Sequence, residues 1–336
     1  MVSAPIRLGV PLSLSGGFAR FGAQARRGLL VWQSFQDGVE LVIEDDRSDP
    51  DALEHVLRRL SRRCDLLLGP YSTRLTRRAG DLAAASGLLL WNHGGSGDDV
   101  ERAHPGHVVS VPTPASRYAD PFVRRLAAFP AAPHLWIVQG RGGFGRQVTA
   151  GAERMARSIG LSCTRLGRGE SLPREIGEPW SLFCAGAFEE DVETVRRARA
   201  MRTPPVEVCA VAAGVREFGT AIADPVGIHG VGQWAPGAAP VAELGIPESD
   251  FLPRYEDLAG AVPDYPAVQA VAAATIATHC ATLADGTARE ALWSAASALD
   301  TTTLFGPFRI DPSTGLQTGH QALLTRWATT GPVIQR

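Results

Sequence analysis

Apolar runs of strand length alternate with segments of helical periodicity along the first third of the chain. The run "IRLGVPLS" precedes "FGAQARRGLLVWQSF", and "VELVIEDD" precedes "DPDALEHVLRRLSRR", where Asp49 and Pro50 predict a helix start. The segments "DLLLGP", "RLTRRAGDLAAAS", "GLLLWN" and "HVVSVPT" continue the alternation. Apolar strands joined by helices indicate a parallel sheet covered by helices on both faces.

The same alternation restarts near His134. Strands are predicted at "HLWIVQG", "LSCTRLG", "SLFCAG" and "VEVCAVA", and helices at "RQVTAGAERMARSIG", "EEDVETVRRARAM" and "VREFGTAIA". The Gly/Pro-rich "GVGQWAPGAAPVAELGIP" predicts a crossing back, followed by the alanine-rich helix "YPAVQAVAAATIATHCATLA" and a short β ending. We therefore predict an α/β fold with two doubly wound, Rossmann-like lobes.

Two neighbouring strands of the first lobe end in small polar residues, in "LLLGPYSTRLTRR" and "GLLLWNHGGSGDD". Ligands of open α/β sheets bind beyond the carboxyl ends of the strands, where helix N-termini favour negative charge. The sequence therefore predicts a ligand crevice with these contact residues: Tyr71, Ser72, Thr73, His93, Gly94, Gly95 and Ser96. The alternative is that the hydroxyls cap helices and that His93 is an ordinary loop histidine.

Composition narrows the class of protein. The 336 residues carry a net charge of −2, with 45% hydrophobic and 20% charged residues, so nucleic-acid binding is not indicated. Five cysteines lack metal-ligand spacing, and we expect free thiols and no cofactor or metal. No run of 18 apolar residues predicts membrane insertion, and no catalytic motif is present, so we expect a protein that is not an enzyme.

One motif favours an enzyme that binds a dinucleotide. The stretch "GRGGFG", residues 140–145, has the G-x-G-x-x-G spacing of dinucleotide-binding loops between a strand and a helix. The following strand offers Arg165 and Arg168 where an NAD site has an acid, which suits only the 2′-phosphate of NADP. An NADP-dependent oxidoreductase is therefore an alternative to a binding protein.

Several segments, in order, resemble the type I periplasmic binding proteins, in particular the branch that binds leucine, isoleucine and valine. They are "IRLGVPLSLSGGFARFGAQARRG", "VIEDDRSDPDAL", "DLLLGPYST", "GLLLWNHGGS" and "TTLFGPFRIDPSTGLQTGHQALLTRW". The resemblance implies two lobes, joined by a three-strand hinge, that close over a small-molecule ligand. We expect lobe one to comprise residues 1–116 and 238–315, and lobe two residues 117–237 and 316–336.

The resemblance also implies roles for individual residues. Ser72 or Thr73 would bind a ligand carboxylate, together with the loop formed by Gly94, Gly95 and Ser96. Aromatic contacts would come from Phe21, Phe144 and Phe188. The family's ammonium-binding acid is replaced here by "AAG", with Ala213 at its centre. A buried ammonium without a paired charge is costly, so we expect free α-amino acids to bind poorly.

Two biological roles are compatible with such a protein. A transport receptor would deliver its ligand to an ABC permease, whereas a cytoplasmic sensor resembling the amide-sensing regulators would act on a regulatory partner protein. The chain as written shows no signal peptide, which predicts a cytoplasmic location. A periplasmic or extracellular location is the alternative if a signal sequence has been removed.

Overall fold

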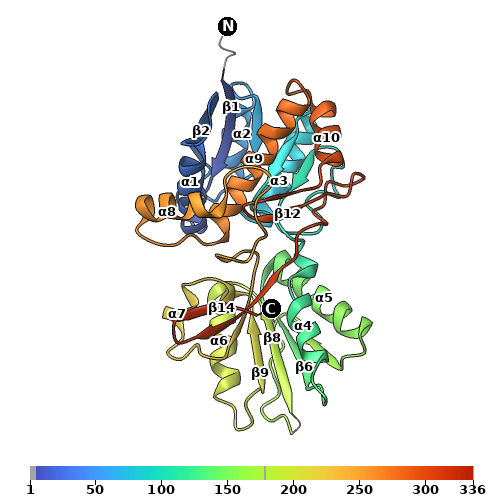
Figure 1. The fold of residues 1–336 in the computed structure, drawn as a ribbon. Helices are drawn as coiled ribbons and strands as arrows, with labels where there is room; N and C mark the ends of the chain where they lie inside the picture. The colour runs from blue at the N-terminus through green and yellow to red at the C-terminus, as the bar shows by residue number, and fades with distance from the viewer. Residues whose placement is uncertain (1–4, 178, 336) are drawn as a thin grey trace. The chain divides into compact units, whose positions relative to one another are not determined.

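The computed structural model describes residues 5–177 and 179–335, which fold as two compact units (Figure 1). Lobe 1 consists of the residues up to Pro112 together with Trp234–His320. Lobe 2 consists of Thr113–Gln233 together with the residues from Gln321 onward. Each lobe contains a parallel-rich sheet with helices on both faces, so the predicted α/β fold with two doubly wound lobes is confirmed.

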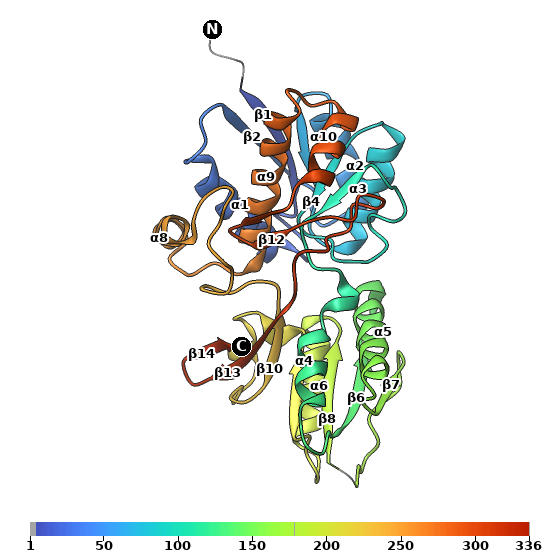
Figure 2. The ribbon, with the colours of Figure 1, turned by 45° about the vertical axis from the view of Figure 1, so that its right-hand side comes forward.

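Lobe 1 is built on a five-stranded parallel sheet in the order β2-β1-β3-β4-β5 (Figures 1 and 2). Its strands are β1 (Ile6–Leu12), β2 (Val39–Asp45), β3 (Leu66–Leu68), β4 (Leu90–Asn92) and β5 (Val108–Ser110). Its helices are α1 (Ala19–Gln33), α2 (Pro50–Leu60), α3 (Thr73–Ala85), α8 (Glu248–Ala259), α9 (Tyr265–Leu283) and α10 (Arg289–Ala298). A hairpin of β11 (Thr301–Thr303) and β12 (Gly306–Phe308) completes the lobe.

Alternation of side chains along each strand separates the two cores of lobe 1. Leu66 and Leu68 pack with α1 and α9, whereas Leu67 between them packs with α2 and α3 on the opposite face. Successive residues of a strand point to opposite faces of its sheet. A strand buried on both faces therefore reads as a continuous apolar run, which is why "LLL" is a strand here.

Lobe 2 contains a seven-stranded sheet in the order β14-β13-β10-β9-β8-β6-β7, with β13 and β14 antiparallel to their neighbours. Its strands are β6 (His134–Gln139), β7 (Cys163–Leu166), β8 (Trp180–Ala185), β9 (Glu207–Ala210), β10 (His229–Gly232), β13 (Leu323–Ala328) and β14 (Gly331–Ile334). Helices α4 (Asp120–Ala127) and α5 (Gly142–Ser158) pack on one face. Helices α6 (Phe188–Arg199) and α7 (Phe218–Ala221) pack on the other. Two short 3₁₀ turns, Ala115–Arg117 and Ala212–Gly214, belong to the same lobe.

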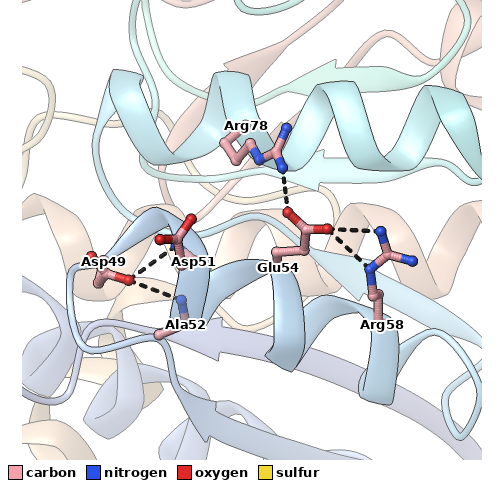
Figure 3. Close-up of polar contacts among 6 residues, drawn as sticks. All are labelled: Asp49, Asp51, Ala52, Glu54, Arg58 and Arg78. Carbon is pink, nitrogen blue, oxygen red and sulfur yellow. Dashed lines mark hydrogen bonds and ion pairs between the residues drawn. The ribbon is translucent and has the colours of Figure 1, made fainter.

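The start of α2 follows the sequence prediction (Figure 3). The Asp49 carboxylate accepts hydrogen bonds from the backbone N–H groups of Asp51 (3.0 Å) and Ala52 (2.9 Å), and Pro50 occupies the first helical position. Further along, Glu54 pairs with Arg58 on its own helix, at 2.7 Å, and with Arg78 of α3. A side-chain cap satisfies N–H groups that the helix itself leaves without acceptors, so this boundary was readable from sequence.

The helical predictions need correction. The segment predicted as the helix "VREFGTAIA" contains only the four-residue α7, because the backbone is extended at Val215 and again at Ile222. Helices α4, α8 and α10 were not predicted; the sequence of α8 includes Pro253 and follows a Gly/Pro-rich stretch. The five cysteines are free thiols, as expected. Among the described residues no helix is long and apolar enough to cross a membrane.

Candidate functional site

The predicted contact residues of lobe 1 lie in loops that touch each other. The loop after β3 pairs with the loop after β4 through a parallel bridge between Tyr71 and Gly94, and the Ser72 N–H donates to the Gly94 carbonyl at 3.1 Å. A Cβ on Gly94 would lie 2.6 Å from the Tyr71 Cα, so only glycine permits this approach. Neighbouring parallel strands therefore place both polar loops at one edge of the sheet.

Aromatic rings cover this edge of lobe 1. Phe21, on the first turn of α1, stacks on Tyr71 with 4.3 Å between ring centroids and 12° between planes. Phe18 lies 6.0 Å from the same tyrosine ring, whose hydroxyl is 2.7 Å from the Tyr265 hydroxyl. The Arg20 guanidinium lies 4.5 Å from the Phe21 ring centre, within cation–π range. Phe21 and Tyr71 were predicted from sequence, whereas Phe18 and Tyr265 were not.

The two hydroxyl residues at the start of α3 have structural partners. Ser72 is the N-cap of α3, with a backbone φ of 84°, and its hydroxyl accepts a long hydrogen bond (3.4 Å) from the Leu75 N–H. Thr73 is buried, and its Oγ1 accepts from the Gly97 N–H at 3.1 Å, which ties the two loops together. A hydroxyl that accepts a bond still has its own proton to donate. The capping alternative therefore holds for Ser72 without excluding a ligand contact.

Asn92, at the end of β4, organises the following loop, and the sequence analysis missed it. Its Oδ1 accepts from the backbone N–H groups of Gly94 (3.1 Å) and Gly95 (2.8 Å). Its Nδ2 donates to the Gly95 carbonyl and to Ser110 Oγ, both at 2.6 Å. Gly94 and Gly95 were expected to offer their N–H groups to a ligand, but these groups already bond to Asn92. An asparagine directly before Gly-Gly is a turn signal that could have revealed this role.

His93 and Ser96 differ in accessibility. The His93 ring is completely buried, and burial lowers its pKa to about 4, so it is neutral near pH 7. A ring with no exposed surface is placed to support the loop from within, and the ligand contact expected of His93 stays a prediction. Ser96 is half-buried in the same loop.

The three predicted residues of lobe 2 follow β6, β8 and β9. Phe144, in the first turn of α5, meets the Tyr118 ring edge-on at 5.4 Å, and Phe188 is the first residue of α6. Both phenylalanines are half-buried. Ala213 is completely buried, and its carbonyl accepts from the Trp327 Nε1 at 2.9 Å. Its side chain and that bonded carbonyl therefore serve packing within the lobe, and the ligand contact expected of Ala213 stays a prediction.

Two adjacent acids at the start of α6 hold the loops of lobe 2. Glu190 Oε2 accepts from the backbone N–H groups of Arg141 (2.9 Å) and Ala187 (3.0 Å), and the carboxylate pairs with the Arg141 side chain. Asp191 is buried, and its Oδ2 accepts from the Ala212 N–H at 3.0 Å. Burial raises the pKa of Asp191 to about 7, against the lowering effect of its backbone hydrogen bonds. The sequence analysis assigned these residues only to a helix.

The loop with dinucleotide-like spacing is occupied by protein contacts. A Cβ on Gly140 would lie 2.3 Å from the Gly186 Cα, so the loops after β6 and β8 touch there. Arg165, the expected partner of a 2′-phosphate, forms an ion pair with Glu153 at 2.7 Å. Among the described residues, no cluster of His, Cys, Asp or Glu is arranged to hold a metal ion. These contacts give the glycines a packing role.

Comparison with known proteins agrees with the resemblance seen in the sequence. Residues 5–168 match the model of the periplasmic binding protein family. No curated protein matches the sequence. Many solved structures share the fold, so the resemblance in fold to the type I periplasmic binding proteins is confirmed.

Three of these structures illustrate the range. A leucine binding protein from Thermotoga maritima MSB8 is 15% identical, with a TM-score of 0.82 and 98% of each chain covered. A branched-chain amino acid transporter substrate binding protein from Streptococcus pneumoniae, in complex with isoleucine, is 14% identical (TM-score 0.76), covering 98% of this chain and 100% of the other. A solute binding protein of an ABC transporter from Rhodopseudomonas palustris BisB5, in complex with 3,4-dihydroxybenzoic acid, is 13% identical (TM-score 0.78), covering 98% and 95%. At such identities the likeness establishes the fold.

Proposed function

We propose that this protein, whose lobes have the type I periplasmic binding protein fold and whose residues 5–168 match that family, binds a small polar organic molecule without transforming it. The observation that carries the proposal is the paired loops of lobe 1, where the residues after β3 and β4 share one edge beneath stacked aromatic rings. Stacked rings next to hydroxyl groups suit a ligand with an apolar body and a carboxylate or carbonyl group.

We assign the ligand contacts of lobe 1 to Phe21, Tyr71, Ser72, Thr73 and Ser96. Hydroxyl groups that donate to a charged acceptor contribute on the order of 1.5–3 kcal/mol each, enough for selective yet reversible binding. Phe144 and Phe188 are the proposed contacts of lobe 2. His93, Gly94, Gly95 and Ala213 are assigned to the support of the loops.

The proposed ligand class is an organic acid or amide without a free ammonium group. The loop after β9 carries Ala212 and Ala213, and Asp191 beneath it already accepts the Ala212 N–H. A buried ammonium without a paired carboxylate is costly. The similar structures bind both classes, since one is a leucine binding protein and another holds 3,4-dihydroxybenzoic acid.

The proposed biological role is delivery of the ligand to an ABC permease. The family description and the similar transporter proteins support this role over that of a cytoplasmic sensor, and they favour the periplasmic or extracellular location over the cytoplasmic one. Fractionation of the native host cells, with antibody detection, tests the location. Recovery of the protein with the cytosol would favour the sensor.

A ligand screen tests the proposed function. We expect 3,4-dihydroxybenzoate or a related acid or amide to raise the melting temperature, because a ligand that binds only the folded state stabilises it by mass action. Free leucine and isoleucine should raise it little. Submicromolar leucine binding by calorimetry would contradict the ligand class, and no stabilisation by any acid, amide or amino acid would contradict the function.

Variants of the loop then locate the binding site. Thr73→Val removes a hydroxyl at nearly constant shape and should weaken binding roughly tenfold to a hundredfold, at about 1.4 kcal/mol per decade. Because Thr73 also accepts the Gly97 N–H, the variant should melt somewhat lower as well. Thr278→Val, on α9 of the same lobe, is the matched control, since its hydroxyl donates only within its helix to Ala274 and Thr275. Equal affinity in both variants would place the ligand elsewhere.

A further inference from the structure

Two consecutive residues of the loop after β2 have a left-handed backbone conformation. The φ angles are 56° at Arg47 and 58° at Ser48. Residues other than glycine are uncommon in this region and persist there only where neighbouring contacts hold them. The Arg47 N–H donates to Asp45 Oδ1 at 2.8 Å. The Ser48 N–H donates to Asp46 Oδ1, also at 2.8 Å, so two adjacent acids at the end of β2 hold the strained pair.

The Ser48 hydroxyl joins this loop to the start of α1. Its oxygen accepts from the Phe18 N–H at 3.0 Å, and its proton is donated to the Ser15 carbonyl at 2.7 Å. Phe18 directly precedes α1, and phenylalanine has no side-chain acceptor with which to cap the helix. A helix leaves its first N–H groups without acceptors of its own. Ser48 therefore supplies, from a different element, an acceptor at the start of α1.

A buried carboxylate fixes the position of Ser48. Asp46 Oδ1, which accepts the Ser48 N–H, also accepts from the Ser13 hydroxyl at 2.6 Å, and both Asp46 and Ser13 are 0% exposed. The loops after β1 and β2 also touch through their backbones, because a Cβ on Gly16 would lie 2.5 Å from the Arg47 carbonyl oxygen. Buried, linked polar groups of this kind stabilise one arrangement of their members. The bonds of Asp46 therefore hold Ser48 at the end of β1.

The start of α1 carries two rings of the aromatic cluster. The Phe18 carbonyl accepts from the Phe21 N–H at 3.0 Å and from the Gly22 N–H at 3.1 Å, so this turn of backbone links the two phenylalanines. Both rings lie against Tyr71, with centroid distances of 6.0 Å for Phe18 and 4.3 Å for Phe21. Aromatic pairs at such distances prefer defined offset or edge-on geometries. The position of the Phe18 backbone therefore determines how both rings meet Tyr71.

The residue type at position 48 indicates a role for its hydroxyl. Glycine adopts a left-handed backbone without steric cost, and asparagine and aspartate adopt it more readily than other residues. Serine at a φ of 58° has no such advantage, but it brings the hydroxyl that bonds to Phe18 and Ser15. The strained conformation thus accompanies a contact that glycine could not make.

We infer that Ser48, held by Asp46, is a positioning residue of the candidate site, which sets how the rings of Phe18 and Phe21 lie against Tyr71. Because Phe21 and Tyr71 are proposed ligand contacts, their relative placement determines how well the apolar body of the ligand fits. The effect on ligand affinity rests on the proposed function, whereas the effect on the rings does not.

The tyrosine NMR spectrum of the ligand-free protein tests the effect on the rings. The chain contains four tyrosines, so ring-¹³C-labelled tyrosine gives few signals, and Tyr71→Phe assigns that of Tyr71. In the wild type we expect a ring-current shift of the Tyr71 signal from the stacked Phe21 ring. Ser48→Gly removes the hydroxyl at a backbone conformation that glycine adopts readily, so the fold should persist while the Tyr71 signal loses most of that shift. The signal of Tyr118, in lobe 2, should stay unchanged.

Arg47→Gly is the matched control for Ser48→Gly. Arg47 is the neighbouring left-handed residue, its side chain is exposed, and its N–H can still donate to Asp45 in the variant. The Tyr71 signal should therefore stay at its wild-type position. An unmoved Tyr71 signal in Ser48→Gly, or an equal movement in Arg47→Gly, would overturn the inference.

Variants of Asp46 test whether the hydrogen bonds carry the effect. Asp46→Ala removes the acceptor of the Ser48 N–H and of the Ser13 hydroxyl, and should move the Tyr71 signal in the same direction as Ser48→Gly. Asp46→Asn keeps an acceptor oxygen and should leave the signal at its wild-type position. A shift in Asp46→Asn as large as that in Ser48→Gly would contradict positioning through these bonds.

Calorimetry tests the effect on binding, with 3,4-dihydroxybenzoate and L-leucine as probes. For whichever probe binds, Ser48→Gly should weaken binding roughly tenfold, whereas Asp46→Asn should stay within about twofold of the wild type. If neither probe binds, the proposed ligand class fails while the Tyr71 signal still decides the placement of the rings. A lower melting temperature of Ser48→Gly with wild-type affinity would show a structural role alone and contradict a positioning role.

Discussion

The two lobes differ in the side chains that hold the loops after the carboxyl ends of their strands. In lobe 1 the loops after β1 and β4 have different side-chain anchors: Asp45 accepts the N–H groups of Leu14 (2.9 Å) and Ser15 (3.2 Å), and Asn92 accepts those of Gly94 and Gly95. In lobe 2 the adjacent Glu190 and Asp191 serve the loops after β6, β8 and β9 together. We therefore expect a disturbance at Asn92 to reach the loop after β4 and the loop after β3 that bonds to it, and a disturbance at the two acids of α6 to reach three loops of lobe 2.

In both lobes these side chains accept hydrogen bonds from loop N–H groups, which the sequence alone would suggest are available to a ligand. A backbone N–H that already donates to a buried side chain has no second proton for a ligand. The groups that remain for recognition in lobe 1 are therefore mainly hydroxyls and aromatic faces. In both lobes, therefore, side chains of the protein accept the hydrogen bonds of the loop N–H groups at the strand ends.

The largest expected effect comes from the buried acid of lobe 2. The folded pKa of Asp191 is about 7, above its ordinary value of 3.8, so the folded state binds a proton that the unfolded state has already lost. The stability from this group is complete below about pH 4 and is lost as pH rises through 7, by at most roughly 4 kcal/mol. Asp191→Asn should flatten urea-unfolding free energies measured between pH 5 and 8. A slope equal to that of the wild type would contradict this assignment.

The next effect tests the anchor of lobe 1. Asn92→Ala removes the partners of two N–H groups, one carbonyl and the Ser110 hydroxyl, all in a buried setting, and should cost roughly 3 kcal/mol in urea unfolding. Hydrogen exchange followed by mass spectrometry should show faster exchange in peptides around residues 92–97 and around Ser72 and Thr73, which bond to that loop. Peptides of lobe 2 are the internal reference, and faster exchange there would contradict a local anchor.

Glu190→Ala tests whether the anchors of lobe 2 are shared. The carboxylate is partly exposed, so we expect a smaller loss of roughly 1.5 kcal/mol in unfolding free energy. Hydrogen exchange should accelerate at two separated segments, around Arg141 and around Ala187, because both N–H groups donate to the same oxygen. Acceleration at only one segment would show that the loops are held independently, as in lobe 1.

The smallest effect concerns the cap of α2, which follows the carboxyl end of β2. Asp49→Ala should cost about 1 kcal/mol, because two N–H groups of the first turn lose their acceptor. Thermal unfolding measures it, and Asp49→Asn, which retains an acceptor oxygen, should recover most of the loss. Asp51→Ala is a control at the same turn, and a loss as large as that of Asp49→Ala would indicate a general charge effect.

Part of the candidate site was readable from the sequence because it depended on neighbours in the chain. Tyr71, Ser72 and Thr73 lie between an apolar strand and the first turn of a helix, so their place at a strand end needed only the local pattern. The burial of His93 and Ala213 could not be read in this way, since the groups that cover them come from distant segments; the Trp327 indole that bonds to Ala213 is one example. Asn92 combines both situations. Its turn before two glycines could be read locally, whereas its hydrogen bond to Ser110 on the neighbouring strand could not.

The sequence by itself determined the alternation of strands and helices, the α/β class with two lobes and the strand ends at which polar loops emerge. These properties follow from side-chain periodicity and from short-range turn and cap chemistry, which act within a few residues. Only the tertiary structure decided which backbone N–H groups remain for a ligand and which acids are buried. Those outcomes depend on hydrogen bonds and desolvation between residues that are separated in sequence, such as Asp191 with Ala212 and Trp327 with Ala213, which no local pattern encodes.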